Sequence, residues 1–288
     1  MATNSPSFAR GGAAAATGEA RQLPAAVMAN EGVLVRHFAY GSNLQRSKLE
    51  GRGKDGVTLR VSDCHAAAVD GYRLAMKLYG FPPFEPAMAT IEPYDGAVCE
   101  GALYYLPRTS YERLFATEGG SGGGYAEVVV RCRLLDEADG AHEVDAITLQ
   151  AKDPLPLDAP CSERYKAFLV DGAAELGLSD AYRAKIAAIP TVSPRPFWLL
   201  AVCHCHSLVV LSKLRLLWFA RPFRAVERRL YRASMSSGML ARAATPALSA
   251  LLLPSASCGA ALGLLDRAAR LVGAPPLVDL ARDFERLI

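Results

Sequence analysis

Near its beginning the chain reads His37-Phe38-Ala39-Tyr40-Gly41-Ser42-Asn43-Leu44. The mostly apolar run that ends at Tyr40 predicts a β-strand over residues 33–40, and the Gly-Ser-Asn that follows is typical of a tight turn at a strand end. Gly41 has no Cβ, so a ligand can approach the backbone, and successive N–H groups in such a turn can bind an anion such as a carboxylate. An ordinary strand-end turn would contain the same residues, so on chemistry alone both interpretations stay open.

The order of the other predicted elements indicates the fold class. Strands are expected over residues 33–40, 64–69, 72–78, 98–106, 125–135 and 143–150, and helices over 109–118, 162–176 and 179–189. The proline-rich segment 82–93 is expected to form an irregular loop that contains one short strand, residues 87–91. This order favours an α+β fold, with a small mixed, strongly bent β-sheet or barrel flanked by helices and a helical C-terminal extension.

Glu118 is the strongest candidate for a catalytic group. It ends a predicted helix that Thr109 can cap, with Glu112 completing a capping box, and five glycines follow within residues 119–124. The negative end of the helix dipole disfavours an ionised carboxylate, which suits a group that exchanges protons near neutral pH. An exposed glutamate at a helix end is the alternative. The glycines, which let a ligand approach, and Tyr125, seven positions on, favour a site.

Taken together, these motifs resemble those of the γ-glutamylcyclotransferases, which have the γ-glutamylcyclotransferase-like or AIG2-like fold. The likeness covers roughly residues 33–190 and rests on residues 38–44, on Glu118-Gly119 followed by Tyr125, and on Tyr165-Lys166. Position 37 is commonly Tyr in that family and is His here. The resemblance implies that Glu118 is catalytic. It also implies that the substrate is bound by His37, Phe38, Ala39, Tyr40, Gly41, Ser42, Asn43, Tyr125 and Tyr165.

The resemblance implies an enzyme that cyclises the γ-glutamyl group of γ-glutamyl-amino acids to 5-oxoproline and releases the free amino acid. Such a lyase needs no metal and no cofactor, takes a small-molecule partner and no nucleic acid, and belongs to glutathione metabolism. Two alternatives stay open. One is a sibling cyclotransferase that acts on γ-glutamylamines or on glutathione, and the other is a catalytically silent binding or membrane-tethered module.

Charge and composition divide the chain into three parts. Residues 1–30 are expected to be a disordered leader, 31–190 the catalytic domain, and 191–288 a basic, apolar-rich extension of unknown role. The extension has a formal charge of +8 against −5 for the preceding residues. An apolar run from residue 197 and the arginines that follow it predict membrane contact or a partner-binding helix over 197–232, with a membrane-spanning segment as the alternative.

The cysteine pattern bears on the compartment. Seven cysteines without a repeating spacing indicate no disulfide framework, so a cytoplasmic protein is expected. The leader leaves an organelle transit peptide open as an alternative, because it has few acidic residues. Cys203-His204-Cys205-His206 does not have the ligand spacing of a structural zinc site. Nothing in the sequence indicates the oligomeric state.

Overall fold

The computed structural model describes residues 23–29, 33–52, 57–81, 85–118, 124–135, 142–192 and 217–235, with a few single positions between 207 and 267. The strands are Met28–Ala29 (β1), Leu34–Ala39 (β2), Asp63–Phe81 (β3), Glu85–Pro107 (β4), Tyr125–Leu134 (β5), Glu143–Ala151 (β6), Cys161–Ser162 (β7) and Thr191–Val192 (β8). The helices are Arg46–Glu50 (α1), Arg108–Thr117 (α2), Glu163–Glu175 (α3), Asp180–Ala187 (α4) and Leu217–Ser234 (α6), with 3-10 turns at Ala25–Val27 (η1) and Ser42–Leu44 (η3).

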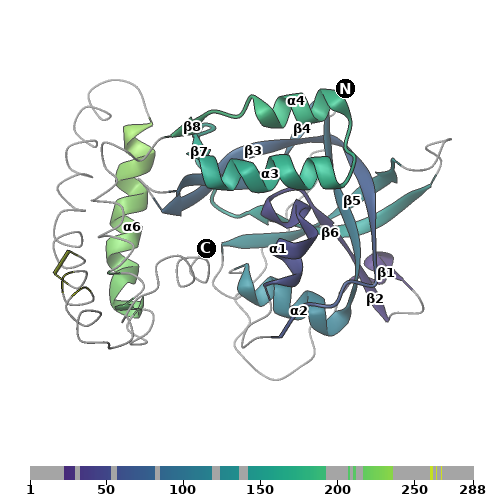
Figure 1. Cartoon of the computed structure of the whole chain (residues 1–288), viewed down its shortest axis with the longest axis horizontal. Helices are drawn as coiled ribbons and strands as arrows, with labels where there is room; N and C mark the ends of the chain where they lie inside the picture. The colour runs from purple at the N-terminus through teal and green to yellow at the C-terminus, as the bar shows by residue number, and fades with distance from the viewer. Residues whose placement is uncertain are drawn as a thin grey trace, which may run out of the picture.

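Five strands close into a small barrel. The sheet has the order β1-β2-β4-β3-β5-β6, and an additional pairing between β2 and β6 joins its two sides. All neighbours are antiparallel except β2 and β6, which are parallel and meet at His37 and Ile147. Figure 1 shows this sheet at the centre, with α3 and α4 side by side on one flank and α1 and α2 on the other. The expected α+β fold with a bent mixed sheet is therefore confirmed.

The hairpin of β3 and β4 is longer than the sequence predicts. Residues 64–69 and 72–78, expected as two separate pieces, form one strand, and residues 85–93 of the expected proline-rich loop belong to β4, while residues 82–84 lie outside the described part of the chain. The two prolines of this segment that the structure describes, Pro86 and Pro93, lie at irregular places of the ladder. Pro93 borders a break in register opposite Asp70 and Tyr72, and Pro86 lies beside the end of the hairpin. The expected turn at residues 136–140 lies outside the described residues.

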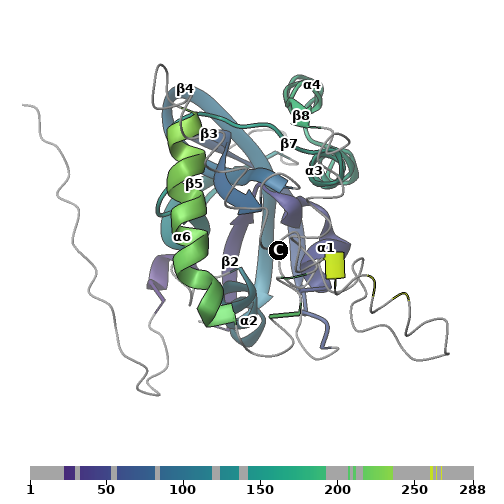
Figure 2. The ribbon, with the colours of Figure 1, turned by 90° about the vertical axis from the view of Figure 1, so that its left-hand side faces the viewer.

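Alternation along β2 places neighbouring side chains in two different parts of the core. Phe38 packs with the larger cluster, which includes Leu103, Tyr165 and Leu169 inside the barrel and beneath α3. Val35 and Ala39 pack with the second cluster, which contains residues of α1 and α2. Figure 2 shows α3, α4 and α1 on one side of the strands, α2 below them and α6 on the other side.

The helix ends agree with the sequence only in part. Ser162 caps α3 by accepting from the N–H of Tyr165, and Ser179 caps α4 in the same way, as predicted. The prediction for α2 is wrong, because this helix begins at Arg108 after Pro107 and has no side-chain cap. Thr109 lies inside the helix and so cannot cap it, while Glu112 accepts a hydrogen bond from Arg108 Nε at 3.0 Å.

Both flanking regions contribute to the domain. Met28 and Ala29 pair with β2 and Val27 is fully buried, so the ordered domain begins before the expected boundary at residue 31. In α6, Arg232 donates to Asp153 and to the carbonyl of Pro154, and Tyr231 packs on Tyr79 with ring centroids 5.6 Å apart. Arg232, expected to serve membrane or partner contact, therefore contacts the domain. Among the helices of the described segments, none combines the length and apolar character that a membrane span requires.

Gly172 allows α3 to lie directly against the turn that follows β2. A Cβ at this position would lie 2.6 Å from Leu44 Cβ and 2.6 Å from the N atom of Gln45. Both of those atoms belong to well-packed parts of the chain, because Leu44 is fully buried. The absence of a side chain at residue 172 therefore fixes the distance between the helix that carries Tyr165 and the turn that carries Ser42 and Asn43.

We predict that Gly172→Ala lowers the free energy of unfolding by about 1–3 kcal/mol, the range for overpacking in a tight core. The direction of the change in the free energy of unfolding is informative, since a glycine-to-alanine substitution in an unobstructed helix raises stability by up to about 1 kcal/mol. Urea unfolding of G172A and of D171A, an exposed neighbour in the same helix, measures the difference. A G172A protein as stable as the wild type would contradict the close packing.

Candidate active site

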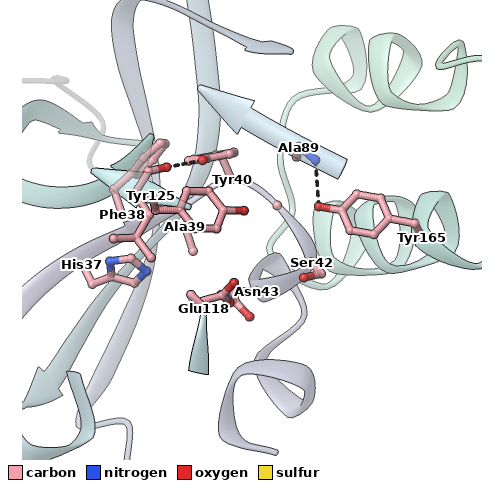
Figure 3. Close-up of a pocket in the computed structure, with 12 residues that line it drawn as sticks. His37, Phe38, Ala39, Tyr40, Ser42, Asn43, Ala89, Glu118, Tyr125 and Tyr165 are labelled. Carbon is pink, nitrogen blue, oxygen red and sulfur yellow. Dashed lines mark hydrogen bonds between the residues drawn. The ribbon is translucent and has the colours of Figure 1, made fainter. Parts of the chain in front are cut away.

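A pocket at the end of β2 brings together residues from four parts of the chain. Its empty space measures about 350 Å³, including the part open to solvent. All ten residues expected from the sequence line it (Figure 3). They come from β2 and its turn, from the end of α2, from β5 and from α3, and Ala89 and Leu149 complete the lining.

Hydrogen bonds hold the turn after β2 in one conformation. The N–H of Leu44 donates to the carbonyl of Gly41 at 2.9 Å, which closes the turn. The buried hydroxyl of Tyr104 donates to the carbonyl of Asn43 at 3.0 Å. A Cβ at Gly41 would lie 3.2 Å from the hydroxyl oxygen of Tyr165, so any other residue here would crowd that hydroxyl. The turn therefore presents Ser42 and Asn43 to the pocket in one orientation.

Glu118 enters the pocket from the end of α2. Its backbone N–H donates to the carbonyl of Leu114 at 2.9 Å, so it is the residue that terminates the helix. Its side chain is 10% exposed. Oε1 accepts a hydrogen bond from Asn43 Nδ2 at 2.7 Å, and Figure 3 shows the two side chains together at the edge of the pocket. The structure thus places the predicted catalytic carboxylate against the predicted substrate turn.

Arg52 is a member of this cluster that sequence reasoning missed. Its Nε lies 2.9 Å from Glu118 Oε1 and donates to Asn43 Oδ1 at 2.7 Å, while its Nη2 donates to Ser42 Oγ at 2.9 Å. Its side chain is 12% exposed. Arg52 follows α1 at a glycine-rich break, where an arginine normally indicates a solvated loop, so no local signal marked it. The guanidinium therefore places a positive charge directly against the carboxylate of Glu118.

Three tyrosines contribute neutral hydroxyl groups to the pocket. Burial raises the pKa of Tyr40, Tyr125 and Tyr165 above the ordinary value, and the nearby Glu118 acts in the same direction. Tyr40 donates to the carbonyl of Leu149. The Tyr165 oxygen accepts from the N–H of Ala89 at 3.0 Å, an arrangement visible in Figure 3, so its own hydrogen is available to another acceptor.

His37 is buried and neutral. Its Nδ1 lies 3.0 Å from the carbonyl oxygen of Ile147, and because a carbonyl accepts, Nδ1 carries the hydrogen. Burial lowers the pKa of His37 to about 4, although the hydrogen bond to Ile147 opposes this shift. The ring packs beside Tyr111 with centroids 5.6 Å apart. Nε2 therefore has a lone pair, which makes His37 an acceptor in a pocket whose tyrosines are donors.

A buried carboxylate supports the helix that carries Tyr165. Glu85 is fully buried and accepts from the Ser162 N–H at 2.8 Å and from the Ser162 hydroxyl at 2.5 Å. Ser162 in turn accepts from the N–H of Tyr165 at 2.9 Å. Burial raises the pKa of Glu85, while the hydrogen bonds from Ser162 lower it. This chain of contacts fixes the start of α3 and with it the position of the Tyr165 ring.

The described side chains also bear on metal binding. Within the described part of the chain, no group of three or more His, Cys, Asp or Glu side chains is arranged to hold a metal ion. The segment from Cys203 to His206 lies outside the described residues.

Fold and site together define an α+β barrel with a small-molecule pocket built around a carboxylate. Comparison with known proteins is consistent with this class, since residues 98–186 match the model of the AIG2-like family. A curated relative, "Gamma-glutamyl cyclotransferase gliK" of Aspergillus fumigatus, is 31% identical over 178 residues, which cover 55% of this chain and 63% of that protein. The domain is therefore similar to the AIG2-like family and to proteins named as γ-glutamyl cyclotransferases.

Two further known proteins are similar to this chain. "Gamma-glutamyl cyclotransferase aclK" of Aspergillus oryzae is 30% identical over 172 residues, which cover 53% of this chain and 60% of that protein. A solved structure titled "Gamma-glutamyl cyclotransferase" aligns with a TM-score of 0.47 at 22% identity, covering 55% of this chain and 89% of that one. The chain spans about three fifths of the length of the curated relatives it matches.

We predict that His37 makes folding stability depend on pH. Its pKa is about 4 in the folded protein against 6.5 in the unfolded chain, so unfolding takes up a proton, and stability falls as the pH drops from 6.5 to 4. Between pH 7 and 4.5 the wild type should lose about 2–3 kcal/mol more than His37→Asn, measured by urea unfolding. His142→Asn, at an exposed position, is the matched control. If wild type and H37N lost the same free energy of unfolding between pH 7 and 4.5, the prediction would be wrong.

Proposed function

We propose that this domain is a γ-glutamylcyclotransferase, which closes the γ-glutamyl group of a small substrate to 5-oxoproline and releases the attached amine. The observation that carries the proposal is the position of Glu118, a mostly buried carboxylate that lines a pocket beside the turn after β2. The names of the two curated relatives, both γ-glutamyl cyclotransferases, support the same reaction class. γ-Glutamyl-amino acids are the proposed substrates, and γ-glutamylamines and glutathione are the alternatives.

Binding of the substrate would use opposite walls of the pocket. The substrate α-carboxylate would lie at the turn, where the backbone N–H groups of Ser42 and Asn43 can act as donors. The Leu44 N–H is already used within the turn. The Tyr165 hydroxyl would donate to the γ-carbonyl oxygen, on which negative charge develops, since its own oxygen already accepts from Ala89. This arrangement folds the substrate so that its α-amine approaches the γ-carbonyl carbon.

The chemical step then needs one proton carrier. Glu118 takes a proton from the α-ammonium group, and the free amine attacks the γ-carbonyl carbon. A new C–N bond closes the five-membered ring, the C–N bond to the attached amine breaks, and Glu118 returns its proton to the departing nitrogen. The regained carboxylate of Glu118 then takes the second proton from the ring nitrogen and passes it to the released amine, which leaves as an ammonium ion. Atoms balance without water, because the substrate divides into 5-oxoproline and the free amine. The neutral His37 would accept a hydrogen bond from a substrate N–H without carrying a competing charge.

The first experiment measures 5-oxoproline release from γ-glutamyl-alanine, from ε-(γ-glutamyl)-lysine and from glutathione. The wild type should turn over at least one of them, and Glu118→Gln should lower kcat by about a hundredfold or more, since the amide cannot carry the proton. Glu112→Gln on the same helix is the matched control, because that residue pairs with Arg108 outside the pocket. Full turnover by E118Q would remove Glu118 from the mechanism, and a folded wild type inactive on all three would favour the silent binding module.

A further inference from the structure

Arg52 touches the proposed catalytic apparatus without lining the pocket. It follows α1 in the chain and contacts three residues of the lining: Ser42, Asn43 and Glu118. A guanidinium has a rigid fork of donors, so its contacts with Ser42 and Asn43 fix its plane. The Nε edge then lies against the carboxylate at 2.9 Å. One residue thereby ties the substrate turn to the end of α2, 75 positions away from Asn43 in the chain.

The contacts of Glu118 are concentrated on one oxygen. Oε1 accepts from Asn43 Nδ2 at 2.7 Å and lies 2.9 Å from Arg52 Nε. Within the described part of the chain no hydrogen bond engages Oε2. Because Glu118 lines the pocket, Oε2 is the oxygen left to meet a bound substrate. The protein therefore holds the carboxylate through Oε1 and leaves Oε2 for the substrate.

Arg52 also places a positive charge against Glu118. Tyr40 from the end of β2, Tyr125 from β5 and Tyr165 from α3 face the same carboxylate, and burial raises the pKa of each, so they are neutral. His37 from β2 is neutral as well. From its own helix, α2, Glu118 meets the negative end of the dipole, which disfavours ionisation. The guanidinium opposes that effect.

We propose that Arg52 is a positioning residue that keeps Glu118 ionised and turns its Oε2 toward the substrate, a role that rests on the proposed function. A base must be ionised before it can accept the ammonium proton, and Arg52 favours that form. The same charge makes the protonated carboxyl a stronger acid, which helps the return of the proton to the leaving amine. The contacts with Ser42 and Asn43 hold the arginine in place while the charge on Glu118 disappears and returns.

The kinetic test compares Arg52→Gln, Arg52→Lys and a control, Arg46→Gln, in which an exposed arginine loses its pair with Glu50. In R52Q, kcat/KM at neutral pH should fall about tenfold or more, and the acid limb of the kcat/KM–pH profile should move up by about one pH unit or more. R52K keeps the charge and loses the fork, so its acid limb should return toward that of the wild type while kcat stays low. R46Q should match the wild type.

A merely structural arginine would give a different result. R52Q would then lower the folded fraction and leave the acid limb of the remaining activity in place, which would overturn the proposal. Thermal unfolding of each variant measures the folded fraction. If R52Q does not fold, R52K decides by itself: unchanged kcat would show that the fork has no positioning role, and a loss of kcat in a folded protein would support it.

A second readout does not depend on turnover. The ¹³C signal of the Glu118 carboxyl carbon, assigned with E118Q in protein labelled at glutamate, is followed against pH in wild type, R52Q and R52K. The titration midpoint should move to higher pH in R52Q and remain close to the wild type in R52K. If the wild type releases no 5-oxoproline, the proposed function fails while this titration still decides whether Arg52 controls Glu118. Identical midpoints in wild type and R52Q would overturn the inference.

Discussion

The seam between β2 and β6 is the constraint on which the barrel and the pocket depend. The two strands pair in register only at His37 and Ile147, so the backbone ladder there is short. Side chains supply the missing bonds: Thr148 Oγ1 donates to the carbonyl of Phe38 at 2.8 Å, His37 Nδ1 donates to that of Ile147, and Tyr40 donates to that of Leu149. His37 and Tyr40 also line the pocket, so closing the barrel and forming the site are the same event.

The same coupling explains why the site tolerates a mostly buried ion pair. Removing Glu118 and Arg52 from water costs free energy that their mutual attraction repays only when their remaining donors and acceptors are satisfied. Asn43 and Ser42 provide those partners, and Tyr104 and Gly172 hold the turn that carries them. On the opposite wall, the buried Glu85 and Ser162 hold Tyr165. The reactive groups are therefore positioned by packed elements of the domain.

Local signals predicted much of the fold, and they failed where tertiary contacts override them. The Ser162 and Ser179 caps, the helix end at Glu118 and the strand at β2 follow from residue type and spacing. Pro93 is compatible with β4 only because the register breaks opposite it, and that break comes from the pairing with β3 rather than from its neighbours in the chain. The cap expected at Thr109 failed because Pro107 starts the helix earlier.

By itself the sequence determined most of the helices and strands, apart from the β3–β4 hairpin and the start of α2, since strand alternation, helix capping and turn chemistry act over a few residues. It marked the turn from Gly41 to Asn43, the glutamate at the end of α2, and Tyr125 and Tyr165. Only the tertiary structure decided that Arg52 meets Glu118 and that His37 is kept neutral by burial, with its Nδ1 bonded to a carbonyl 110 positions away. The physical reason is that charge and burial act through space, and the distances that set them exist only once the barrel has closed.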